Sequence, residues 1–183
     1  QVDAMKRLVN EFRDYARLPA ADLKPLDLNL LVQDVLQLYE QDTAPVNVIV
    51  QLESGCPLIL GDAEQLRQVI HNLLQNAQDA TEAARKPEET PSVILRTQWA
   101  AAAQRVRLVV LDQGTGFPDH ILKRAFEPYV TTKSRGTGLG LAVVKKIADE
   151  HGARIDLSNR IVNGVVEGAQ VSLSFAIHQK VAT

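Results

Sequence analysis

The chain has 183 residues, of which 45% are hydrophobic, and a formal net charge of −2 at pH 7. This length and composition suffice for one ordinary domain with its own core plus an appendage. Acidic and basic residues are interspersed, which argues against a dedicated nucleic-acid binder with a basic face. The same balance is compatible with a small anionic ligand held by a few local donors.

Cys56 is the single cysteine, so neither an intrachain disulfide framework nor a cysteine-based metal cage can form, and a reducing compartment is expected. No apolar run approaches the roughly 20 residues that span a bilayer. The first residues, QVDAMKRLVNEF, lack a starting Met and the apolar stretch of a signal peptide. We therefore expect a cytoplasmic domain from a longer protein, with any membrane anchor lying upstream.

Residues 1–17 are predicted to form one amphipathic helix. Its apolar residues follow the 3-4-3-4 spacing of a coiled-coil seam: Val2, Met5, Val9, Phe12 and Ala16. Such a stripe either packs on its own domain or pairs with another helix. We favour the second interpretation, because the Pro-containing linker at 17–25 separates this helix from the rest of the chain.

The rest of the chain alternates helical and extended segments. Helices are predicted over 28–41, 63–85, near 119–125, and from about Leu139 to the glycine at 152, with Asp27 and Asp62 as N-caps of the first two. Strands are predicted at 46–53, 57–61, 92–100, 105–112, 154–160 and 169–177. This order predicts a two-layer α/β sandwich with a mixed, mostly antiparallel sheet.

The long helix carries polar residues in an unusual place. Asn72, Asn76 and Asp79 lie at i, i+4 and i+7, so they share one face. Asparagine is a poor helix former, and two of them stacked in mid-helix call for a reason. One interpretation is a solvated face. The other is a ligand or metal site, because amide oxygens suit a hard cation such as Mg²⁺ bound to phosphate oxygens.

A second candidate follows the apolar strand at 105–112. Asp112 ends this strand, and Gly114 and Gly116 follow it at alternate positions. A buried aspartate needs a donor partner, and the amino group of a base is one candidate. The glycines would allow the backbone to approach a flat ligand closely. The alternative is an ordinary turn after a strand.

A third candidate is the stretch KSRGTGLGLAVV, which carries Gly136, Gly138 and Gly140. It matches neither the P-loop nor the dinucleotide fingerprint, which requires different spacing and a preceding strand. What remains is a glycine loop that leads into a helix N-terminus, where free amides favour phosphate. Lys133 and Arg135 add positive charge just upstream.

Taken together and in this order, the motifs resemble those of the GHKL, or Bergerat-fold, ATP-binding domain of sensor histidine kinases. HNLLQNAQDA resembles the N box, DQGTGF the first glycine box, FEPYVTTK the F box and GTGLGLAVV the second glycine box. The resemblance covers about residues 25–178. Upstream, QVDAMKRLVNEFRDYARLP is similar to the end of the second helix of the dimerisation and phosphotransfer domain, in wording closest to NtrY-type nitrogen-regulation kinases.

This resemblance implies three segments. Residues 1–18 would be the end of that phosphotransfer helix, 19–26 a linker, and 27–180 the ATP-binding catalytic domain. The full-length protein would be a homodimer, either anchored in the bacterial inner membrane or not, whereas this chain, with most of the four-helix bundle missing, is expected to be mostly monomeric.

Residue by residue, the resemblance implies a site for ATP and Mg²⁺. Asn76 would coordinate the Mg²⁺ on the ATP phosphates, and Asn72 would support the phosphates or the metal. Asp112 would accept a hydrogen bond from the adenine amino group, in a pocket shaped by Gly114 and Gly116.

The second glycine box would place backbone amides on the phosphates, and its residues are Gly136, Thr137, Gly138, Leu139 and Gly140. Lys133 and Arg135 would lie in the lid over the nucleotide and meet the terminal phosphate. Phe126 would anchor the lid. Asp79 departs from the family pattern, because a carboxylate there would repel phosphate, and it is not assigned to the site.

Position 72 bears on the reaction type. Hydrolytic relatives carry a Glu one turn before the metal-binding Asn to activate water, and here that position is Asn72. The expected activity is therefore a protein-histidine kinase (EC 2.7.13.3) that protects ATP from water and relies on positioning and charge neutralisation. The alternatives are a GHKL-type ATPase and a non-catalytic nucleotide-binding signalling module.

The phosphate acceptor is expected outside this chain, so no catalytic residue is assigned. None of the four histidines (His71, His120, His151 and His178) stands in the acceptor context His-Glu-x-x-Asn-Pro. The implied partners are the phosphotransfer domain of the same protein and a response regulator of the NtrX or NtrC kind, with no nucleic acid.

Overall fold

The computed structural model describes residues 2–39, 46–128, 130 and 140–179. Five strands form one sheet in the order β2-β4-β5-β7-β6. β2 runs parallel to β4, and every other neighbouring pair is antiparallel. The bounds are β2 (Asn47–Gln51), β4 (Ser92–Ala100), β5 (Arg105–Leu111), β6 (Arg154–Val162) and β7 (Val165–Ala176).

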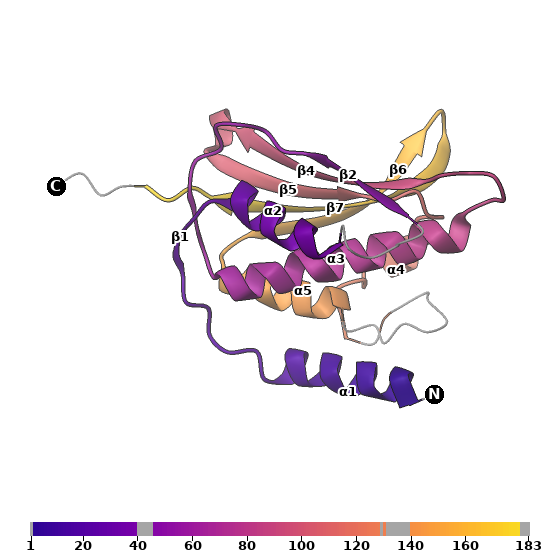
Figure 1. The fold of residues 1–183 in the computed structure, drawn as a ribbon, viewed down its shortest axis with the longest axis horizontal. Helices are drawn as coiled ribbons and strands as arrows, with labels where there is room; N and C mark the ends of the chain where they lie inside the picture. Colours follow the sequence, from indigo (N-terminus) through magenta and orange to yellow (C-terminus); the bar gives the residue numbers. More distant parts are fainter. Residues whose placement is uncertain (1, 40–45, 129, 131–139, 180–183) are drawn as a thin grey trace.

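Three helices cover one face of this sheet, so the predicted two-layer sandwich with a mostly antiparallel sheet is confirmed (Figure 1). They are α2 (Leu28–Tyr39), α3 (Ala63–Ala84) and α5 (Gly140–Glu150). The predicted caps form, because Asp27 accepts from the Leu30 amide and Asp62 from the Gln65 amide. The short α4 (Asp119–Leu122) ends earlier than predicted.

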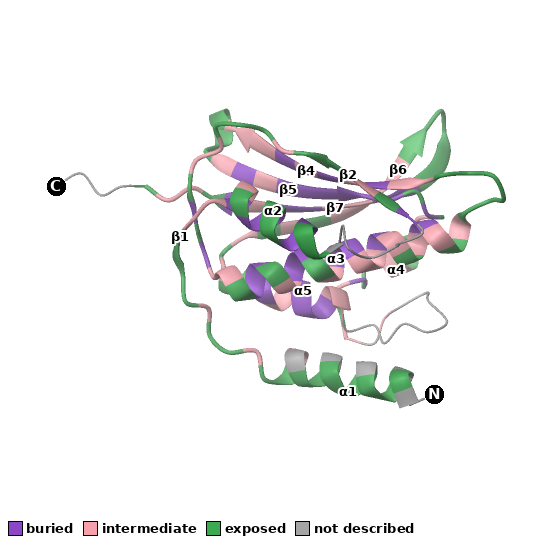
Figure 2. Cartoon of the chain, in the orientation of Figure 1, coloured by how far each residue is buried: buried purple, intermediate pink, exposed green. Residues whose placement is uncertain are grey.

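The core lies between the helices and the sheet (Figure 2). Alternate residues of the central strands point to the helices, which is why β4 buries Val93 and Leu95 while β5 buries Val106 and Leu108. The helical period of α3 presents a continuous apolar stripe to them: Leu66, Val69, Ile70, Leu73 and Ala77. This packing fixes which face of α3 is left for polar residues.

Two strands, β1 (Lys24–Leu26) and β7, differ most from the sequence-based prediction, and β2, β3 (Ile59–Gly61), β5 and β6 differ from it by one or two residues at an end. β1 lies in the segment predicted as a linker and pairs with β3. β7 begins four residues earlier than predicted, because Asn163 and Gly164 form a tight turn with φ of 51° and 79°. Asn-Gly between β-branched residues is a strong hairpin signal, so this turn could have been found from the sequence.

The linker before β1 is held by side chains of α3 and α5. Gln65 Nε2 donates to the Pro19 carbonyl at 2.8 Å, and Asp62 Oδ2 accepts from the Asp22 amide at 2.9 Å. Farther upstream, Lys146 Nζ of α5 donates to the Tyr15 carbonyl at 2.7 Å. The same Nζ atom lies 4.7 Å from the centre of the Tyr15 aromatic ring. These contacts dock the end of α1 and the linker on the domain.

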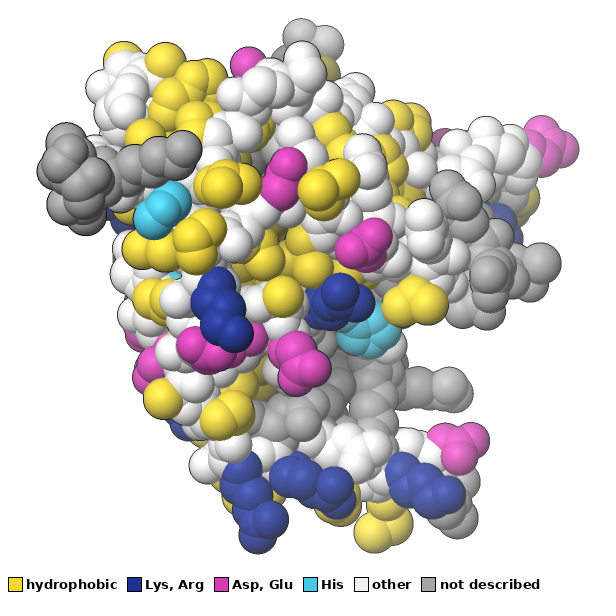
Figure 3. Space-filling model, turned by 60° about the vertical axis from the view of Figure 1, so that its left-hand side comes forward, with side chains coloured by type: hydrophobic (Ala, Val, Ile, Leu, Met, Phe, Trp, Pro, Cys, Tyr) yellow, Lys and Arg dark blue, Asp and Glu magenta, His cyan; other side chains and the backbone are white. Residues whose placement is uncertain are grey.

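α1 (Val2–Ala16) lies outside the two layers, below the helices in Figure 1. The predicted seam is open to solvent, since Met5, Val9 and Phe12 are 68%, 54% and 51% exposed. Dark-blue Lys and Arg side chains line the lower edge in Figure 3, where this helix lies. Within the described part of the chain, no helix is both long and apolar enough to cross a membrane.

Candidate functional site

Asp112 stands at the end of β5 and is only 9% exposed. Its Oδ1 atom accepts hydrogen bonds from the backbone amides of Gly114, at 3.0 Å, and Ala169, at 2.8 Å. Its own amide donates to the Ala169 carbonyl at 2.9 Å. A buried carboxylate requires donors of this kind, and two on one oxygen fix its orientation.

The glycines around Asp112 allow close backbone packing. A β-carbon at Gly114 would lie 3.0 Å from the Ala80 carbonyl oxygen of α3, and Gly116 has a φ of +75°. Gly168 of β7 has a φ of +145°, and a β-carbon there would collide with the Asp112 carbonyl oxygen. Close packing and backbone conformation thus explain why glycine stands at positions 114 and 116. The role of these glycines in an adenine pocket stays a prediction.

Asn72 and Asn76 are half-buried on α3 and face the start of α5. Asn72 Nδ2 donates a long hydrogen bond, 3.4 Å, to the Gly140 carbonyl. Asn76 Nδ2 would lie 3.4 Å from a β-carbon at Gly140, so a larger residue there would press on this amide. The structure therefore brings together three residues that were predicted to share a phosphate and metal site. Asp79, left out of that prediction, is exposed.

α3 connects the two groups. The Thr81 hydroxyl accepts from the Gln113 amide at 3.0 Å, next to the contact of Ala80 with Gly114. From Asn72 to Thr81 the helix rises about 14 Å. One rigid element therefore spaces the Asp112 loop and the start of α5 at a distance suited to a ligand with a base and a phosphate chain.

Two residues of β6 that the sequence analysis did not single out also contact this region. Asn159 Oδ1 accepts from the Phe117 amide and Asn159 Nδ2 donates to the Phe117 carbonyl, both at 2.8 Å. Arg160 NH1 donates to the Asp112 carbonyl at 2.6 Å. One signal was available: Asn159 is a polar residue at the position where the alternation of Ile155 and Leu157 predicts an apolar one.

Six predicted site residues lie outside the described residues: Lys133, Arg135, Gly136, Thr137, Gly138 and Leu139. Gly140, the last residue of the glycine box, is described and begins α5. Phe126 is half-buried in the turn after α4.

The four histidines lie in different surroundings. His71 and His120 are exposed, and His178 is half-buried with its amide bonded to the Leu58 carbonyl. His151 Nε2 accepts from the Asp62 amide at 3.0 Å, and its Nδ1 lies 2.8 Å from the Ile147 carbonyl. His151 is used for structure.

Among the described residues, no group of three His, Cys, Asp or Glu side chains could hold a metal ion. Mg²⁺ usually takes one or two protein ligands and completes its shell with water and phosphate oxygens. The half-buried side-chain amide of Asn76 faces the start of α5, so it could supply the one protein ligand of an Mg²⁺ ion that is already bound to phosphate oxygens.

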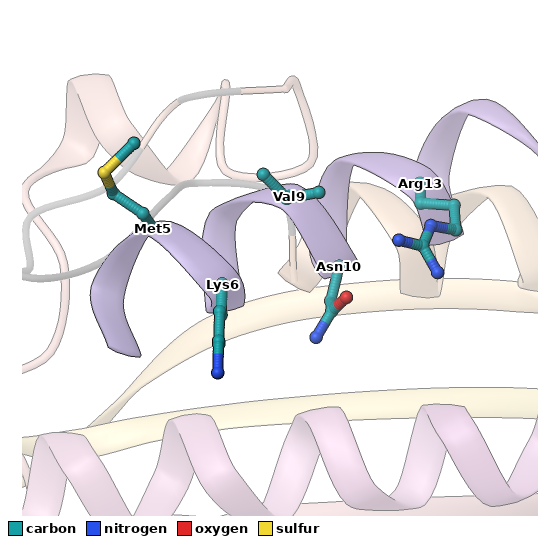
Figure 4. A pocket seen from close by; sticks show the side chains of 5 residues that line it. All are labelled: Met5, Lys6, Val9, Asn10 and Arg13. Atoms are coloured by element: carbon teal, nitrogen blue, oxygen red, sulfur yellow. The ribbon is translucent and has the colours of Figure 1, made fainter. Parts of the chain in front are cut away.

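A groove lined by Met5, Lys6, Val9, Asn10 and Arg13 runs along α1 (Figure 4). In the close-up, Met5 and Val9 point to one side of the helix and Lys6 and Asn10 to the other. The groove includes no residue of the Asp112 or Asn76 groups, so it is separate from the candidate site.

The sequence profile described as histidine kinase-, DNA gyrase B-, and HSP90-like ATPase matches residues 61–179. The chain belongs to this family. It is 33% identical, over 171 residues and 88% of its length, to an NtrY-like sensor histidine kinase of Rickettsia bellii. It spans about a quarter of that relative, 26%.

Solved structures place this family member among histidine kinases. Full-length ShkA in complex with AMPPNP superposes with a TM-score of 0.75 at 29% identity, covering 97% of this chain and 37% of that one. The nucleotide-free catalytic domain of histidine kinase ThkA gives 0.70 at 27% identity, covering 85% of this chain and 95% of that one. The predicted GHKL fold and the similarity to NtrY-type kinases are both confirmed.

Proposed function

We propose that this chain is the catalytic domain of a sensor histidine kinase that binds ATP with Mg²⁺ and donates the γ-phosphoryl group to a histidine. The observation that carries the proposal is the arrangement on α3: the oriented carboxylate of Asp112 lies near one end, and the Asn72–Asn76 pair faces the start of α5. The AMPPNP complex of ShkA supports it, because AMPPNP is an ATP analogue.

Each residue has a defined task. Asp112, whose Oδ1 is already held by two amides, accepts a hydrogen bond from the exocyclic amino group of adenine. Asn76 offers its amide oxygen to the Mg²⁺ that neutralises phosphate charge. The amides at the start of α5, from Gly140 and the glycine box before it, face the phosphates at the positive end of the helix dipole.

Asn72 favours phosphoryl transfer over hydrolysis. A carboxamide does not accept a proton at neutral pH, so it cannot activate water as a glutamate would. The domain then holds ATP until a histidine side chain reaches the γ-phosphate, and positioning supplies most of the rate. A GHKL-type ATPase is the alternative, and multiple-turnover hydrolysis by this chain would favour it.

The acceptor histidine belongs to the phosphotransfer domain of the same protein, which lies mostly outside this chain. Residues 1–18 are the end of its second helix, 19–26 the linker, and 27–180 the catalytic domain. From that histidine the phosphoryl group passes to an aspartate of a response regulator, of the NtrX or NtrC kind by the similarity to NtrY-like kinases. We place this domain in the cytoplasm and expect it to be mostly monomeric by itself.

Calorimetric titration with a non-hydrolysable ATP analogue tests the site. We expect Asn76→Ala to lower the affinity at least about tenfold when Mg²⁺ is present, because the metal loses its protein ligand. Gln68→Ala, two turns earlier on the same helix, is the matched control and should bind as the unmodified chain does. Equal affinities for the unmodified chain and Asn76→Ala would contradict the proposed metal ligand.

Incubation with ATP labelled at the γ-phosphate tests where the acceptor lies. We expect no stoichiometric, acid-labile label on this chain alone, because His71, His120, His151 and His178 are not in an acceptor context. Such a label would contradict the assignment of the acceptor to the missing phosphotransfer domain.

A further inference from the structure

We infer that Asn159 and Arg160 are positioning residues for adenine recognition, because they hold the loop that carries Asp112. This inference rests on the proposed binding of ATP. Neither residue belongs to a glycine box or the N box, and both come from β6, the edge strand farthest from β2.

The two side chains reach the loop across the intervening strand. β7 lies between β5 and β6, with Asn159 opposite Ala169 and Arg160 opposite Gly168. These are the smallest side chains available, so β7 leaves room for neighbours to pass over it. Because successive strand residues point to opposite faces, Asn159 crosses one face of the sheet and Arg160 the other.

Asn159 binds the loop at Phe117 in a way that few side chains can copy. Its amide oxygen accepts from the Phe117 N–H and its amide nitrogen donates to the Phe117 carbonyl, each at 2.8 Å. The pair satisfies both backbone groups of one loop residue, as a neighbouring strand would. Asn159 Oδ1 also lies 2.7 Å from where a β-carbon of Gly116 would stand, so the loop backbone and this amide pack directly together.

Arg160 acts on Asp112 from the other face. Its NH1 donates to the Asp112 carbonyl at 2.6 Å, a charge-assisted bond of the stronger kind. Asp112 makes further hydrogen bonds. Its amide donates to the Ala169 carbonyl, and its Oδ1 atom accepts from the amides of Ala169 and Gly114. The main chain of Asp112 is therefore fixed between β7 and Arg160, and the side chain between two amides.

This arrangement matters for specificity, because one carboxylate can discriminate a base only if it is aimed accurately. A shift of about 1 Å in a recognition group is enough to lose most of its benefit. Loss of the Asn159 contacts frees the 113–117 loop at one end, while α3 still holds Gln113 through Thr81. On the phosphate side, Asn72 bonds to the Gly140 carbonyl and Asn76 lies against Gly140, so α3 and α5 hold that part of the site together.

Binding of ADP and of inosine diphosphate, which lacks the exocyclic amino group, tests this role. We expect the unmodified chain to prefer ADP, and Asn159→Ala to lower the affinity for ADP about tenfold while that for inosine diphosphate changes less than about twofold. Ser158→Ala, the preceding residue on β6, is the matched control and should keep the preference.

Substitutions of Arg160 test the positioning role independently of Asn159. Arg160→Ala should also reduce the ADP preference, and Arg160→Lys should restore part of it by keeping a cationic donor near the Asp112 carbonyl. Thermal unfolding of every variant identifies any that does not fold. The inference is then decided on those variants of Asn159 and Arg160 that do fold.

The outcomes separate two failures. An unchanged ratio of the two affinities in Asn159→Ala and Arg160→Ala, including an equal loss for both ligands, would overturn the positioning role, because a purely structural residue affects both ligands alike. An unmodified chain that binds neither nucleotide would instead overturn the proposed function.

Discussion

The two ends of α3 are both tied to other parts of the chain by side-chain contacts, but they are built differently. At its N-terminal end, Asp62 and Gln65 make bonds of 2.8–3.1 Å to the linker and to the helix itself. From the middle of the helix onward, Asn72 contributes a bond of 3.4 Å to Gly140, and Thr81 accepts one of 3.0 Å from the Gln113 amide. Here Asn76 and Ala80 also lie close to the glycines Gly140 and Gly114. The first end therefore ties the helix to the linker, whereas the second half holds the Asp112 loop and the start of α5, where we propose that the ligand binds.

The largest effect on stability is expected from Gly168→Ala, which adds one methyl group beside Asp112. Gly168→Ala forces an alanine to a φ near +145° and drives its β-carbon into the Asp112 carbonyl. We expect a loss of at least about 3 kcal/mol in the free energy of unfolding, together with loss of nucleotide binding. Thermal or denaturant unfolding measures it.

Gly164→Ala is the control for this substitution, since Gly164 has a φ of +79° but nothing within 4 Å of a β-carbon. It should cost only about 1 kcal/mol from backbone strain. Similar losses at the two glycines would show that the close approach to Asp112 does not matter.

The next effect concerns the linker end. Asp62→Ala removes both the α3 cap and the bond from the Asp22 amide, so we expect a loss of about 2 kcal/mol in stability with nucleotide affinity unchanged. Asp27→Ala is the matched control, because Asp27 caps α2 through the Leu30 amide and its loss should cost about 1 kcal/mol. A large fall in nucleotide affinity in Asp62→Ala would remove the contrast between the two ends.

The smallest effect is a dependence on pH at the linker end. Burial by itself raises the pKa of Asp62, but the backbone amides of Asp22, Gln65 and Glu64 outweigh it, so the pKa is lowered from its ordinary value. A lowered pKa means that the carboxylate stabilises the fold above the unfolded-state value of about 3.9, and that this contribution is lost as the pH falls through the lower folded value.

We therefore expect the melting temperature of the unmodified chain to fall more steeply below about pH 4 than that of Asp62→Asn, which does not titrate. Melting curves between pH 3 and pH 6 measure the difference. Parallel curves for the two proteins would show that Asp62 is not the group responsible.

Much of the fold could be predicted from local patterns. The apolar period of α3, its cap Asp62 and the alternation in β4 and β5 are visible within a few residues, and the structure confirms them. β1 was missed because three residues, one of them Pro25, show no alternation, and its pairing with β3 depends on residues far away in the sequence. The Asn163–Gly164 turn was missed although its signal was present.

The site divides in the same way. Asp112, Asn72 and Asn76 could be proposed as site residues because each stands out locally: a carboxylate after an apolar strand, and two amides in mid-helix. Asn159 and Arg160 were not, since their importance arises only when β6 is placed beside β7. The predicted roles of Lys133, Arg135 and the first part of the glycine box concern residues outside those described.

The amino-acid sequence by itself determined most of the elements, the caps and the family, because periodicity, capping and motif order depend on neighbours along the chain. Only the tertiary structure decided which backbone groups those side chains serve. Asn72 meets Gly140 across 68 positions, Asp112 meets Ala169 across 57 and Asn159 meets Phe117 across 42. The physical reason is that the strand order β5-β7-β6 and the packing of α3 on α5 bring these groups within hydrogen-bonding distance.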